Sequence, residues 1–120
     1  MATRSDEDDG KEVAMNESLK PILAELKQRL TELYGERLSQ LILFGSQARG
    51  DATEDSDVDV LVVLEGEVDL EEEVRRTSDL RLEYSLEKGT LICPVFTSKK
   101  RYQERNSPLL MNVQREGLRL

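Results

Sequence analysis

The chain has 120 residues, of which 38% are hydrophobic and 35% are charged, and its formal net charge is −8. This length fits one small domain, and its core must be built from Leu, Val and Ile because there is no Trp and few aromatic residues. The absence of His, together with a single Cys, excludes the common zinc sites and the Ser-His and Cys-His catalytic pairs. Any chemistry must therefore use carboxylates, hydroxyls, Lys or Arg, alone or with a hard metal ion.

The charges are unevenly distributed along the chain. Residues 51–87 carry fourteen acids against three bases, whereas residues 88–120 carry seven bases against two acids. The acidic middle argues against nucleic-acid binding, which needs clustered Lys and Arg, and it suits attraction of divalent cations. The basic C-terminal third is either a contact surface for an acidic partner or nucleotide phosphates, or an ordinary solvated surface.

The N-terminal residues and the apolar runs bear on localisation. The start of the chain is polar and acidic, unlike a secretory signal, and no apolar run approaches the roughly 20 residues of a membrane span. A single Cys cannot form an internal disulfide, which fits a cytoplasmic protein. We therefore expect a cytoplasmic protein that does not enter a membrane.

Periodicity divides the chain into a tail and a domain. Residues 1–15 have no apolar period and predict a disordered acidic tail, and residues 16–120 predict a single domain. In that domain, apolar residues at helical spacing from Leu19 to Leu33 predict a helix that ends at Gly35. The later elements are expected as a strand (41–44), a polar loop (45–56), a strand (58–64), a helix (70–87), a strand (90–97) and two short helices (98–105 and 108–116). This order predicts an α/β (α+β) fold, in which helices pack mainly on one face of a mixed sheet of three to four strands.

The segment between the first two predicted strands has the composition of a phosphate and metal site. The first strand ends in Gly45-Ser46, where glycine permits close approach to the backbone and Ser46 supplies a hydroxyl at the start of a helical turn. After a spacer of ten residues, Asp57 and Asp59 follow on the next strand. Period two places both carboxylates on one strand face, about 6.5–7 Å apart at the backbone, while Val58 faces the core. Two such acids repel each other unless a cation lies between them, and Mg²⁺ accepts oxygen ligands of this kind.

This segment resembles the minimal nucleotidyltransferases of the polymerase-beta-like superfamily. The resemblance rests on an apolar strand, Gly45-Ser46, a spacer, and Asp57-Val58-Asp59 in a second apolar strand. It implies the small nucleotidyltransferase fold for residues 16–120. It also implies that Gly45 and Ser46 hold the triphosphate of ATP and that Asp57 and Asp59 are catalytic residues that bind Mg²⁺. Arg49 would either neutralise a phosphate or form a salt bridge that anchors the loop.

A third carboxylate, usual on a later strand of this superfamily, is missing from the expected strand at residues 90–97, where Cys93 or Val95 would occupy its place. The candidates to supply the group instead are Glu83, Glu87 and a partner protein. Small stand-alone members of the superfamily resemble antitoxins paired with a HEPN-type toxin. The resemblance therefore implies transfer of AMP from ATP to a tyrosine of that partner, and it leaves a homo-oligomer open.

Two other functions compete with that one. The chain could be an inactive binding module that neutralises its partner by forming a complex, as the missing carboxylate suggests. An RNA-tailoring enzyme would need a basic acceptor surface, which only the C-terminal third of the chain offers.

Overall fold

The computed structural model describes residues 17–50, 52, 57–104 and 107–120. The predicted tail at residues 1–15 therefore lies outside the described residues, as does most of the loop before Asp57. Within the described ranges, no helix is both long and apolar enough to cross a membrane.

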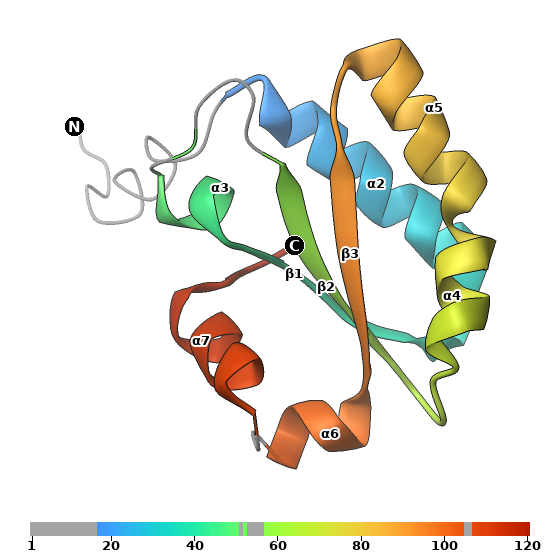
Figure 1. Ribbon diagram of the computed structural model, residues 1–120, viewed down its shortest axis with the longest axis vertical. Helices are drawn as coiled ribbons and strands as arrows, with labels where there is room; N and C mark the ends of the chain where they lie inside the picture. The colour runs from blue at the N-terminus through green and yellow to red at the C-terminus, as the bar shows by residue number, and fades with distance from the viewer. Residues whose placement is uncertain (1–16, 51, 53–56, 105–106) are drawn as a thin grey trace.

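The elements follow the predicted order, with one addition at the C-terminus (Figure 1). In chain order they are α2 (Leu19–Tyr34), the 3₁₀ turn η1 (Gly35–Arg37), β1 (Leu38–Phe44), α3 (Ser46–Arg49), β2 (Val58–Leu64), α4 (Leu70–Arg76), α5 (Ser78–Lys88), β3 (Ile92–Ser98), α6 (Lys99–Glu104), α7 (Pro108–Glu116) and β4 (Leu118–Arg119).

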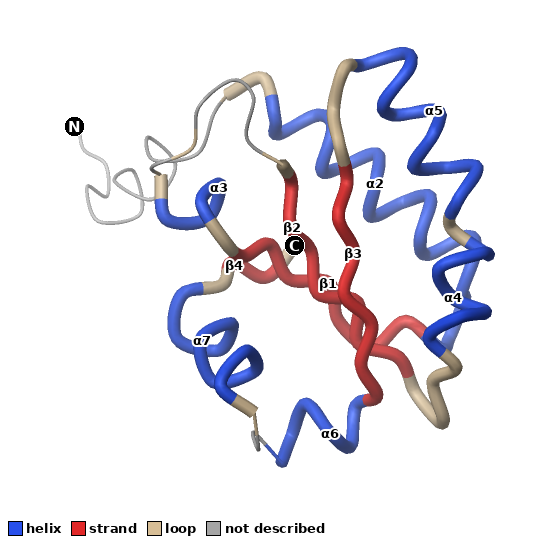
Figure 2. Tube along the Cα trace, in the orientation of Figure 1, coloured by secondary structure: helices blue, strands red, loops and turns tan. Residues whose placement is uncertain are grey.

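The four strands form one mixed sheet in the order β3-β2-β1-β4 (Figure 2). β1 pairs antiparallel with both β2 and β4. β2 and β3 are parallel, and α4 and α5 form the crossover between them. The predicted α/β class and mixed sheet are confirmed. The antiparallel pairing of β1 with β2 brings the end of the first strand against the start of the second.

Alternation along the strands divides the core between two faces of the sheet. Val58, Val60 and Val62 belong to the larger apolar cluster, which α2 and α5 cover. Leu61 and Val63 belong to a smaller cluster on the opposite face, against α7 and part of α6. Because side chains alternate with period two, Asp57 and Asp59 share the face of Leu61 and Val63. The prediction that Val58 and Val60 face the core is confirmed.

Two predicted boundaries were wrong, and one short strand was not predicted. The helix expected over residues 70–87 is two helices, because the Thr77 hydroxyl donates to the Glu73 carbonyl oxygen at 3.0 Å and the helix bends there. β1 begins at Leu38 rather than at residue 41, because its polar first residues still pair with β2. The short β4 was not predicted, because a two-residue strand is defined only by its partners in β1.

A buried carboxylate joins α4 to α2. Glu73 is almost fully buried, and its Oε1 accepts a hydrogen bond from the Tyr34 hydroxyl at 2.8 Å. The guanidinium groups of Arg76 and Arg37 lie 3.3 Å and 3.7 Å from its two oxygens. A buried carboxylate without such partners would strongly destabilise the fold. The inward face of α4 is therefore polar.

We expect Tyr34→Phe to lower the free energy of unfolding by about 2 kcal/mol, because it removes a hydrogen bond to a buried charged group. Tyr84→Phe is the matched control, since the Tyr84 hydroxyl is also buried but forms no hydrogen bond of standard length and angle with the described residues. Its loss should change stability little. Urea unfolding of both variants would measure the difference, and equal losses would contradict this account of Glu73.

Candidate functional site

The contact between the end of β1 and the start of β2 forms the centre of the candidate site. Gly45 follows β1 with a φ of 77°, a conformation that favours glycine. A Cβ atom at this position would lie 2.5 Å from Oδ2 of Asp59. Only glycine therefore allows the backbone to lie directly against this carboxylate, as its position in the motif predicted.

Ser46 begins the short helix α3 immediately after this contact. The amides of Ala48 and Arg49 both donate to the Gly45 carbonyl oxygen at 3.1 Å, and these bonds close the turn. Ser46 itself is half-buried. The predicted helical turn after β1 is confirmed. Its first residue, Ser46, directly follows the glycine whose backbone contacts Asp59.

Asp57 and Asp59 lie at the start of β2, on one face of the sheet. Phe44 is in register with Asp59 across the β1–β2 pair, so the acids lie beside the Gly45-Ser46 turn. Asp57 is exposed and Asp59 is half-buried. Burial raises the pKa of Asp59 above its usual value, the negative charge of Asp57 raises it further, and Arg49 opposes both effects. A bound cation would relieve this unfavourable arrangement.

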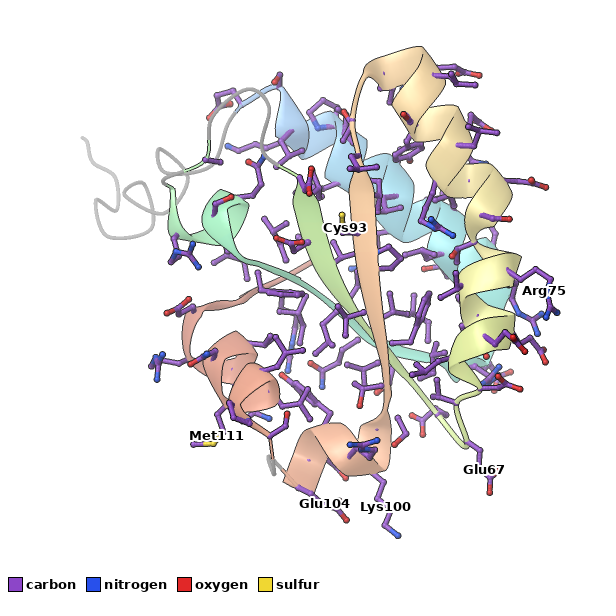
Figure 3. All side chains as sticks on the ribbon, viewed as in Figure 1. Glu67, Arg75, Cys93, Lys100, Glu104 and Met111 are labelled. Atoms are coloured by element: carbon purple, nitrogen blue, oxygen red, sulfur yellow. The ribbon has the colours of Figure 1, made fainter. Side chains whose placement is uncertain are left out.

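Cys93 lies where a third carboxylate would complete the acidic face. In the parallel β2–β3 pair it is in register with Asp59, and Figure 3 shows it on β3 beside β2. Of the two residues named for this place, the register therefore selects Cys93, whereas Val95 pairs with Leu61 farther from the acids. Cys93 is half-buried rather than a core residue. Burial and both aspartates raise the pKa of its thiol, so the thiol is neutral at physiological pH.

The two glutamates considered as substitutes do not complete the acidic face. Both oxygens of Glu83 accept hydrogen bonds from the guanidinium of Arg29, at 2.7 Å and 3.2 Å. This carboxylate of α5 is therefore bound to α2. Glu87 is an exposed residue of α5. Among the described residues, no group of three or more acidic, His or Cys side chains could hold a metal ion. The described residues thus offer two aspartates, and with these alone a bound ion would need its other ligands from water or a substrate.

Two carboxylates nevertheless fit Mg²⁺, which prefers oxygen ligands and usually keeps several waters or substrate phosphates. The donor set of Asp57 and Asp59 contains only oxygen, and burial first and the charge of Asp57 second raise the pKa of Asp59, effects that a bound cation would oppose.

Arg49 connects α3 to the C-terminal part of the domain. Its guanidinium lies 3.5 Å from a carboxylate oxygen of Glu116, the last residue of α7. The anchoring salt bridge considered from the sequence is therefore present. Its partner was missed, because a pairing across so many residues leaves no local pattern. The Arg49 side chain is about half exposed. Its positive charge also acts on Asp59, whose pKa it lowers.

A separate pocket of about 780 Å³ lies at the opposite ends of β2 and β3. Its lining includes Glu65, Glu67 and the basic run Lys99 to Arg101. Lys99 forms an ion pair with Glu65 at 3.5 Å. None of the residues that the motif singled out lines this pocket, so the cavity is distinct from the candidate site.

Comparison with protein families supports the resemblance found in the sequence. Residues 23–112 match the family described as "Nucleotidyltransferase domain". Two relatives come from Methanocaldococcus jannaschii. "Putative protein adenylyltransferase MJ0604" is 36% identical over 79% of this chain and 90% of its own length. "Putative protein adenylyltransferase MJ0141" is 37% identical over 65% of this chain and 78% of its own length.

Solved structures share the fold at lower sequence identity. A "putative nucleotidyltransferase" from Sulfolobus solfataricus superposes with a TM-score of 0.57 at 20% identity, covering 86% of this chain and 82% of that one. A toxin–antitoxin structure with AMP-PNP gives a TM-score of 0.52 at 18% identity, covering 78% of this chain and 68% of that one. A mutant of the MntA toxin–antitoxin complex gives 0.53 at 15% identity, covering 79% and 69%. These likenesses confirm the fold.

We expect Asp59→Asn to raise the melting temperature at pH 7 by about 2–4 °C, a gain limited by solvent screening of a half-buried group. The folded protein holds the Asp59 proton more tightly than the unfolded chain. The penalty for ionising this carboxyl in the fold therefore grows as pH rises from the ordinary aspartate pKa to the raised one, and it is complete above the raised pKa. Below the ordinary aspartate pKa of 3.8, both states are protonated and the gain should vanish. Thermal melts from pH 3.5 to 7 would test this, and a gain independent of pH would contradict it.

Proposed function

We propose that this chain, which belongs to the nucleotidyltransferase domain family, transfers AMP from ATP to a tyrosine hydroxyl of a partner protein. The observation that carries the proposal is the contact of the Gly45-Ser46 turn with the Asp59 carboxylate. The names of the two Methanocaldococcus jannaschii relatives support this reaction class. The partner is a HEPN-type toxin, and the chain acts as its antitoxin in the cytoplasm. The likeness to the toxin–antitoxin structures supports that role.

Each residue of the candidate site has a role in this proposal. Gly45 and Ser46 bind the triphosphate through the backbone of the turn and the Ser46 hydroxyl. Asp57 and Asp59 would hold Mg²⁺, which when bound neutralises phosphate charge and orients the reacting phosphate. Arg49 is half exposed beside the acids, and it contributes positive charge toward the same phosphates.

The reaction replaces a phosphoanhydride bond of ATP with a phosphate ester bond to tyrosine. The tyrosine oxygen forms a bond to the α-phosphorus of ATP, and the bond from that phosphorus to the bridging oxygen of the β-phosphate breaks. Pyrophosphate leaves, and the phenolic proton passes to water, because among the described residues only two carboxylates lie at the site and no third one is available to accept it. Holding both reactants in line is then the main contribution of the protein.

One observation favours a second function. Cys93 occupies the position opposite Asp59 where a third carboxylate would lie. A neutral thiol there neither strengthens cation binding nor accepts a proton. The alternative is therefore a binding module of low or no activity that neutralises the partner by forming a complex with it.

The deciding experiment is intact-mass spectrometry of a HEPN-type partner protein after incubation with the chain and Mg²⁺·ATP. We expect the partner to gain about 329 Da per transfer, the mass of one AMP group, as the phosphoryl-transfer chemistry requires. Asp57→Asn with Asp59→Asn should abolish both the gain and the binding of Mg²⁺·ATP, because it removes both carboxylates. A stable complex with no mass gain would establish the binding module instead.

Position 93 gives a second test that does not depend on the partner. We expect Cys93→Asp to increase affinity for Mn²⁺, a paramagnetic substitute for Mg²⁺, by at least tenfold, because it adds a carboxylate in register with Asp59. Cys93→Ser is the matched control and should leave the affinity within about twofold of the wild-type value. Electron paramagnetic resonance measures free Mn²⁺ directly. Equal affinity in both variants would show that residue 93 does not face the metal.

A further inference from the structure

Leu91 is an exposed apolar residue beside the acids of the candidate site. Its side chain is 51% exposed, and it directly precedes the edge strand β3. The Val58 amide donates a hydrogen bond to the Leu91 carbonyl oxygen at 2.9 Å, so the pairing of β2 with β3 extends to Leu91. The register that sets Asp59 opposite Cys93 therefore sets Asp57 opposite Leu91 when it is continued toward the start of both strands.

The Leu91 side chain lies on the face of the sheet that carries the acids. Ile92 is buried in the larger apolar cluster on the other face, and both neighbours of Ile92 point away from that cluster because strand side chains alternate. The second neighbour, Cys93, agrees with this direction. Both aspartates raise the pKa of its thiol, and a hydrogen bond to Asp57 contributes to the shift. Leu91 and Cys93 therefore border the two aspartates along β3.

The two sides of the acids differ in chemistry. The Gly45-Ser46 turn lies on the β1 side, whereas the β3 side carries Leu91 and Cys93, an apolar side chain and a neutral thiol. We call these two residues the β3 flank. Figure 1 shows α3, which begins at Ser46, and β3 on opposite sides of the start of β2. Neither residue of the β3 flank carries a charge that would attract a phosphate, and an apolar group can bury surface against Leu91.

The geometry of phosphoryl transfer assigns these two sides to the two reactants. The attacking oxygen and the leaving oxygen lie roughly in line, on opposite sides of the α-phosphorus. In the proposed reaction the Gly45-Ser46 turn binds the leaving phosphates, so the acceptor oxygen approaches from the β3 flank. The oxygen that joins the α-phosphorus to the ribose is off this line, so the adenosine lies beside the line and not at its end. The acceptor side chain is therefore the group that reaches Leu91.

We propose that Leu91 contacts the phenol ring of the tyrosine that accepts AMP, and that this contact favours tyrosine over an aliphatic hydroxyl such as that of serine. The inference deepens the proposed function and rests on it, because the transfer reaction defines the side from which the acceptor enters. A phenol ring buries apolar area against a leucine side chain, whereas the side chain of serine has little apolar surface to bury. Leu91 is thus a specificity-determining residue for the acceptor.

Methyl NMR tests this contact without requiring AMP transfer. The protein, labelled at its leucine methyl groups, is saturated with Mg²⁺ and the ATP analogue in which a methylene group replaces the oxygen between the α- and β-phosphorus atoms. N-acetyltyrosinamide is then added, and N-acetylserinamide is the matched probe. We expect the ring current of the tyrosine probe to shift the Leu91 methyl signals, and the serine probe to leave them in place. The signals of Leu82, which is 58% exposed on α5, should move with neither probe. No shift at Leu91, or equal shifts at both leucines, would overturn the proposal.

The kinetics of transfer to the HEPN-type partner give a second test. We expect Leu91→Ala to lower kcat/KM for the partner about tenfold and to leave the affinity for Mg²⁺·ATP within about twofold of the wild-type value, because the lost contact is to the acceptor. Leu91→Met keeps an apolar side chain of similar volume and should retain most of the rate. Leu82→Ala is the matched control and should change neither quantity. Weakened binding of Mg²⁺·ATP by the same factor in Leu91→Ala would show that Leu91 contacts the nucleotide, and it would overturn the proposal.

The outcomes separate this inference from the proposed function. No mass gain on the partner with the wild-type chain would reject AMP transfer, and the methyl shifts would still decide whether a phenol ring lies against Leu91. Mass gain with unchanged kcat/KM in Leu91→Ala would overturn the role of Leu91 and leave the transfer reaction standing. Equal rates of transfer to the partner and to its variant with serine in place of the acceptor tyrosine would overturn the preference for an aromatic acceptor.

Discussion

The arrangement of the candidate site depends on the contact between the Gly45 backbone and the Asp59 carboxylate. The antiparallel register of β1 and β2 forces this contact, because it sets Phe44 opposite Asp59. Any side chain at position 45 would collide with that carboxylate. The turn that follows β1 and the two acids that begin β2 are thus held together by the sheet itself, although they are separated by a loop. Burial of Asp59 and repulsion between the two aspartates disfavour the ionised site, and a bound cation would offset both effects.

The parts of this arrangement that sequence could predict are those set by local pattern. The alternation in β2 correctly assigned Val58 and Val60 to the core, which placed Asp57 and Asp59 on the other face. The α/β class and mixed sheet followed from the order of elements. The helix predicted over residues 108–116 is α7, and the Ser107 hydroxyl before it accepts a hydrogen bond from the Leu110 amide. In each case, the residues that decide the structure lie within a few positions of one another.

The parts that sequence could not predict depend on contacts between distant residues. β4 exists only because Leu118 and Arg119 meet the middle of β1. The partner of Arg49 is Glu116, which no spacing in the chain connects to the motif. The register of β2 with β3 likewise had to be known before Cys93 could be chosen over Val95 as the residue opposite Asp59. Helical periodicity also could not show that α4 turns Glu73 inward, since its partner Tyr34 lies on another helix.

The helix α4 is held against the domain by a buried polar contact rather than by apolar packing. This helix buries a carboxylate and exposes Leu70 and Val74, the reverse of what a surface helix that only packs on its own core would show. The buried Glu73 is satisfied by Tyr34 and two arginines, so the inward face is stable without apolar residues. The exposed Leu70 and Val74 side chains are therefore not needed to hold α4 against the domain, because the polar contacts of Glu73 do so.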